Sequence, residues 1–93
     1  MRSTHQSHLD AVLARLDGSR QVALDRLFAF LRIPSISTLP EHKEDVRRAA
    51  QFAADKLFEI GFPRVDIDET PGHPIVFAER IGTDAPTLLL YGH

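Results

Sequence analysis

The chain has 93 residues with 11 basic and 13 acidic side chains, a net charge of −2 at neutral pH and no cysteine. This length allows one small domain. Because neither the basic nor the acidic residues form a block along the sequence, we expect no contact with nucleic acid or membrane. The composition also excludes a disulfide framework, and with no signal-peptide core and no apolar stretch of about 20 residues we predict a cytoplasmic protein.

Two helices are predicted in the first third of the chain. The first carries an apolar stripe at helical spacing, formed by Leu9, Val12, Leu13 and Leu16. Ser3 with Gln6 forms a capping box at its start, and Ser7 is an alternative cap. The second helix begins near Ser19 and ends before Pro34, because proline disfavours helical backbone at the preceding residue. Apolar residues surround most of this second helix, so we expect it to be covered on more than one side.

A third helix is predicted from about residue 41 to residue 60, after a loop that contains two prolines. Its inner face is formed by Val46, Ala49, Ala50, Ala53, Leu57 and Ile60. Small alanines allow close approach to another backbone, as when a helix lies flat on a sheet. Gly61 follows as the residue that ends the helix.

Beyond Gly61 the hydrophobic period changes from 3.6 residues to two, which predicts strands. We expect an antiparallel meander of three strands at about 64–69, 75–81 and 87–91. The last strand holds three successive leucines, so both of its faces should be buried. The predicted fold class is therefore α/β, with three helices followed by an antiparallel meander that belongs to a larger mixed sheet, incomplete within these residues.

Five histidines are the first candidates for chemistry, and none has a partner at metal-ligand spacing. His5 and His8 are interpreted as solvated, and His42 as part of a charged, solvated helix face. His73 follows a Pro-Gly turn, where a hydrogen bond to the backbone is expected. His93 comes directly after the most apolar strand, at the end where open α/β sheets bind ligands. Position alone nevertheless favours an ordinary surface residue.

The remaining charged residues predict no catalytic group. Asp66, Asp68 and Glu69 are interpreted as a solvent-facing row rather than as an acid/base pair. Arg47 and Arg48 are interpreted as an ordinary solvated pair on the third helix.

Four stretches together resemble one enzyme family: "FLRIPSIST", "RAAQFAADKLFEIGF", "GHPIVFAERIG" and "APTLLLYGH". The resemblance is to the dinuclear-zinc peptidases that include carnosinase, aminoacylase, acetylornithine deacetylase and carboxypeptidase G. The stretches at 34–37 and 91–93 look most like the cytosolic, carnosinase-like dipeptidases. The resemblance extends from about residue 9 to residue 93.

In that family the Gly-His at the end of the strand continues as His-x-Asp-Val, and the histidine binds one zinc ion. The resemblance therefore implies that His93 is a metal ligand. It implies two zinc ions in the full-length parent and little or no zinc in the 93 residues alone. It places no catalytic residue within the chain. The resemblance also implies that residues 1–93 are the N-terminal portion of a metallopeptidase catalytic domain, truncated after the first metal-ligand motif begins.

The resemblance implies that the full-length parent is a zinc-dependent dipeptidase or exopeptidase. Such an enzyme hydrolyses the peptide bond of dipeptides or short peptides, and this portion would supply scaffold and one ligand while being inactive alone. The resemblance also leaves room for a homodimer formed through a domain outside these residues. Two alternatives stay open: an N-acyl amino acid deacylase of the same family, and a non-catalytic α+β interaction module.

Overall fold

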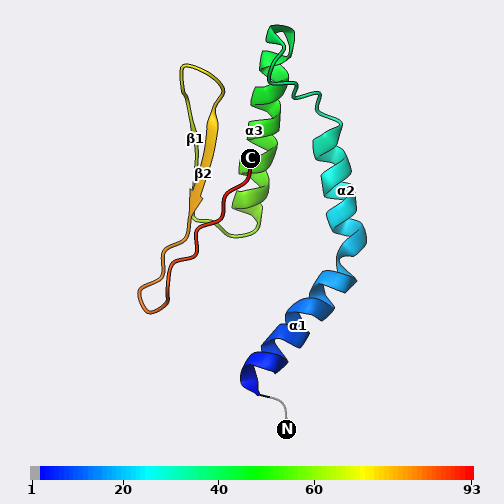
Figure 1. The fold of residues 1–93 in the computed structure, drawn as a ribbon, viewed down its shortest axis with the longest axis vertical. Coiled ribbons are helices and arrows are strands. Elements are labelled where there is room, and N and C mark those ends of the chain that lie inside the picture. Colours follow the sequence, from blue (N-terminus) through cyan, green and yellow to red (C-terminus); the bar gives the residue numbers. More distant parts are fainter. Residues whose placement is uncertain (1–2) are drawn as a thin grey trace. The chain divides into compact units, whose positions relative to one another are not determined.

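A computed structural model describes residues 3–93, and the chain divides into two compact units, Met1–Ile33 and Pro34–His93. The described residues form a small mixed α/β structure with three α-helices and one two-stranded antiparallel sheet. The first unit contains α1 (Thr4–Gly18) and α2 (Arg20–Leu31) (Figure 1). The second unit contains the 3-10 turn η1 (Pro40–His42), α3 (Lys43–Glu59), β1 (Arg64–Asp68) and β2 (Ile75–Glu79). Within residues 3–93, no helix combines the length and the apolarity that crossing a bilayer requires.

The helices of the first unit begin and end close to where they are predicted. The side chain of Ser3 accepts a hydrogen bond from the backbone N–H of Gln6 at 3.1 Å, so Ser3 is the N-cap and Ser7 lies inside the helix. Ser19 separates α1 from α2, and α2 ends before Pro34 as expected. The expected cover around α2 is absent, since neither helix of the unit contains a buried residue. A unit of two helices offers each of them a single neighbour, which leaves the remaining apolar sides exposed.

In the second unit α3 packs against both strands (Figure 1). The strands pair antiparallel with Val65 opposite Ala78 and Ile67 opposite Val76. These four residues are half-buried and share one face of the hairpin, because side chains alternate along a strand. The other face carries the charged residues of both strands together with the exposed apolar residues Ile75 and Phe77, so the period-two prediction is confirmed for β1.

The core of the second unit is small and centres on alanines of α3. Ala49 and Ala54 are the buried hydrophobic residues of the described chain, at 7% and 6% exposure. The prediction that alanines bring α3 close to a sheet is therefore confirmed for Ala49, whereas Ala54 was not on the predicted face. Ile60 is 66% exposed, contrary to expectation, because α3 ends at Glu59 and Ile60 is its C-cap. Gly61 follows with φ of 108°, the left-handed conformation typical of a helix end.

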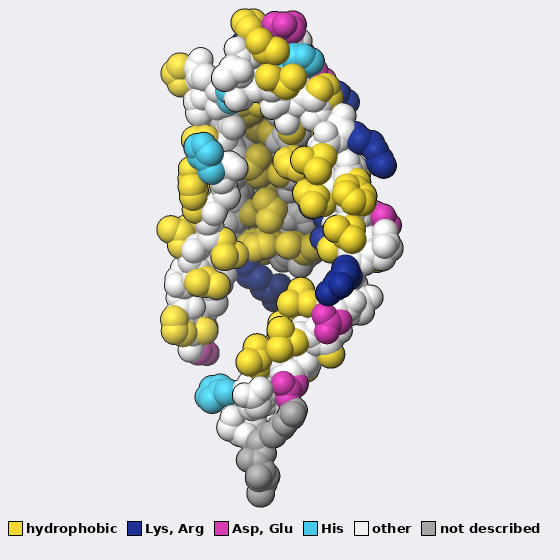
Figure 2. Space-filling view, turned by 45° about the vertical axis from the view of Figure 1, so that its right-hand side comes forward, with side chains coloured by type: hydrophobic (Ala, Val, Ile, Leu, Met, Phe, Trp, Pro, Cys, Tyr) yellow, Lys and Arg dark blue, Asp and Glu magenta, His cyan; other side chains and the backbone are white. Residues whose placement is uncertain are grey.

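The predicted third strand is wrong for this structure, because the sheet contains β1 and β2 alone among residues 3–93. Residues 87–91 are unpaired, and Leu88, Leu89 and Leu90 are 80%, 87% and 78% exposed. Apolar composition favours a strand, but a strand forms only when its backbone finds a partner edge. Figure 2 accordingly shows hydrophobic side chains over much of the visible face.

Candidate functional site

His93, the predicted metal ligand, lies at the end of this unpaired segment and is exposed. Its Nδ1 atom is 2.8 Å from the hydroxyl of Tyr91, and the two rings are tilted by 49° with centroids 6.2 Å apart. A hydrogen bond at Nδ1 orients the imidazole, and when Nδ1 is the donor, Nε2 keeps its lone pair for a ligand. The geometry around His93 thus fits the supply of one ligand nitrogen.

A zinc site needs more ligands than this segment offers. Among residues 3–93, no three His, Cys, Asp or Glu side chains gather closely enough to hold a metal ion. Protein zinc sites use three or four such ligands. A zinc ion bound at His93 would therefore need further ligands besides the described side chains around it.

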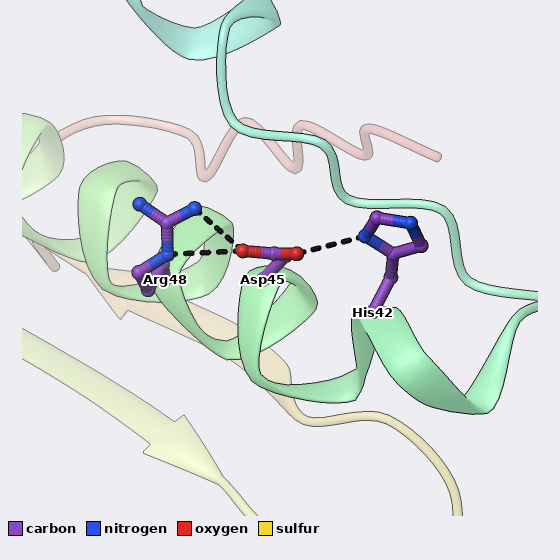
Figure 3. A network of polar contacts seen from close by, with 3 residues as sticks. All are labelled: His42, Asp45 and Arg48. Carbon is purple, nitrogen blue, oxygen red and sulfur yellow. Dashed lines mark hydrogen bonds and ion pairs between the residues drawn. The ribbon is translucent and has the colours of Figure 1, made fainter.

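A second polar cluster lies where η1 joins α3 (Figure 3). The Asp45 carboxylate contacts Nδ1 of His42 at 2.8 Å through one oxygen and the guanidinium of Arg48 through the other. The side chains of His42 and Asp45 are 27% and 23% exposed. The predicted charged face around His42 is present, but His42 itself is half-buried, because Asp45 binds its ring from one turn further along the helix.

The charge on Asp45 fixes the orientation of His42. The hydrogen bond from Arg48, and secondarily the one from His42, lower the pKa of the Asp45 carboxyl below its ordinary value. An ionised carboxylate only accepts hydrogen bonds, so Nδ1 of His42 must donate, and a neutral ring then carries its lone pair on Nε2. An acidic group in the first turn of α3 also suits the helix dipole. The i, i+3 spacing of His42 and Asp45 is the sequence signal that predicts this contact.

His73 connects two loops of the second unit. Its Nε2 donates a hydrogen bond to the backbone carbonyl of Ser37 at 2.7 Å. The turn itself is fixed by Thr70, whose hydroxyl donates to the carbonyl of His73 at 2.6 Å and accepts from the N–H of Gly72 at 3.0 Å. The prediction that His73 binds the backbone is confirmed, and its role here is structural.

The charges predicted to be solvated on the third helix and first strand are exposed, and they also form ion pairs with one another. Arg47 on α3 binds the carboxylate of Glu69 through both terminal nitrogens, with Nη2 to Oε2 at 2.6 Å. This hydrogen bonding lowers the pKa of Glu69 and raises that of Arg47. Arg64 on β1 binds Asp66 at 2.9 Å and Glu79 at 3.0 Å, and both contacts raise its pKa. These contacts join α3 to the hairpin and one strand to the other.

The chain has no match among protein-family models, curated proteins or solved structures. Its own residues are therefore the basis for inferring what it does. Three of its histidines are engaged by neighbouring groups, and of these His93 is the one placed at the end of an exposed apolar segment. His5 and His8 are exposed on α1, as expected.

Proposed function

We propose that this chain is the N-terminal part of the catalytic domain of a two-zinc exopeptidase that hydrolyses dipeptides or short peptides. In this proposal His93 binds one zinc ion, and the parent protein acts in the cytoplasm. The observation that carries the proposal is the hydrogen bond of Nδ1 of His93 to the Tyr91 hydroxyl, directly after an apolar extended segment. It is supported by the resemblance of 34–37 and 91–93 to cytosolic dipeptidases.

The hydrogen bond at Nδ1 supports a ligand role for chemical reasons. A histidine that binds zinc through Nε2 commonly uses its other nitrogen in a hydrogen bond, which fixes the tautomer and the orientation of the ring. The Tyr91 hydroxyl occupies that position in this chain. His93 would then be oriented before any metal arrives.

The other ligands would come from residues outside these 93. A single imidazole competes poorly with water for a metal ion, so the chain alone should bind zinc weakly and hydrolyse no peptide. The helices and the hairpin would act as scaffold. The exposure of Leu88, Leu89 and Leu90 supports this, because a strand with apolar residues on both faces is typical of a sheet covered on both sides.

An N-acyl amino acid deacylase is the alternative within the same family, since both reactions cleave an amide beside a free carboxylate. Comparing turnover of dipeptides with turnover of N-acetyl amino acids by the parent protein separates the two. A homodimer of the parent, through a further domain, is compatible with either.

The coding sequence that follows His93 gives the cheapest test. The proposal expects it to continue as any residue, then Asp and Val, as in the family that the chain resembles. A natural stop codon at that point would contradict the proposal and favour a non-catalytic α+β interaction module.

A further inference from the structure

We draw no further inference here: the strongest candidate, the mostly apolar hollow between β2 and residues 85–89, lies along an apolar edge of the second unit, and nothing in the structure shows what covers it.

Discussion

The Tyr91 hydroxyl lies 2.8 Å from Nδ1 of His93, two residues along an extended segment. In extended backbone, side chains two positions apart point to the same side, so this spacing brings the two groups together without any tertiary packing. The contact is local and belongs to the sequence Tyr-Gly-His itself. It therefore persists whether or not 87–91 finds a partner strand.

Tyr91→Phe should release the ring of His93. Without the hydroxyl, Nδ1 loses its hydrogen-bond partner, and the neutral imidazole should exchange between both tautomers. Nitrogen-15 NMR of the side chain should show one dominant tautomer for His93 in the unaltered chain and averaged shifts in the variant. His8, exposed on α1, serves as the internal control. Identical ring shifts in the two proteins would show that the hydrogen bond is not formed in solution.

The ion pairs of Asp45 and Glu69 predict a loss of stability in acid. Both carboxyl groups have lowered pKa values in the folded chain. Their contribution to the free energy of unfolding is therefore present above the ordinary pKa values of 3.8 and 4.5, and it is lost as the pH falls through the lowered values. The free energies of unfolding of Glu69→Gln and of the unaltered chain, measured in urea, should differ at about pH 7, and the difference should shrink as the pH falls below 4.5. The difference should also shrink in high salt, because the pair is exposed. A difference that is independent of pH would contradict the ion-pair interpretation.

Removing the N-cap should weaken α1. Ser3→Ala deletes the acceptor for the Gln6 N–H, and loss of such a cap costs about 1 kcal/mol. Ser7→Ala is the matched control, because it places a better helix former inside the helix. Chemical shifts of residues in the first turn should move toward coil values in Ser3→Ala only. Equal effects of the two changes would show that α1 begins further along the chain.

The tight contact of α3 with the hairpin should not tolerate a larger side chain. Ala49 is 7% exposed, so Ala49→Leu should overpack the contact and lower the free energy of unfolding by about 1–3 kcal/mol. Gln51→Leu, on the exposed side of the same helix, should change stability little. Unfolding curves of the two variants give the comparison, and a tolerated Ala49→Leu would show that α3 does not pack closely on the strands.

Local signals predicted the elements that form within a short stretch of chain. The cap at Ser3, the end of α2 before Pro34, and the change to period two after Gly61 all depend on neighbours in sequence, and the structure contains each of them. The backbone contact of His73 was also predictable, because a histidine after a Pro-Gly turn lies close to loop carbonyls.

Contacts between distant residues were not predictable in the same way. The pairing of Arg47 with Glu69 depends on how α3 lies across the hairpin, and no short-range sequence pattern links the two residues. The wrong third strand has a related cause, because leucines at 88–90 indicate a strand but do not provide the edge that pairs with it. The position of His93 in a site likewise depends on groups beyond its own segment.

The zinc content and the dipeptide turnover of the full-length parent protein test the central claim most directly. The proposal predicts that His93→Ala removes one ligand from one of two metal ions and severely lowers turnover, while His5→Ala, His8→Ala and His42→Ala have little effect. In the unaltered protein the Zn–N distance at His93 should be about 2.0–2.1 Å. If His93→Ala retains both zinc ions and near-normal turnover, His93 is not a ligand and the proposed function is wrong.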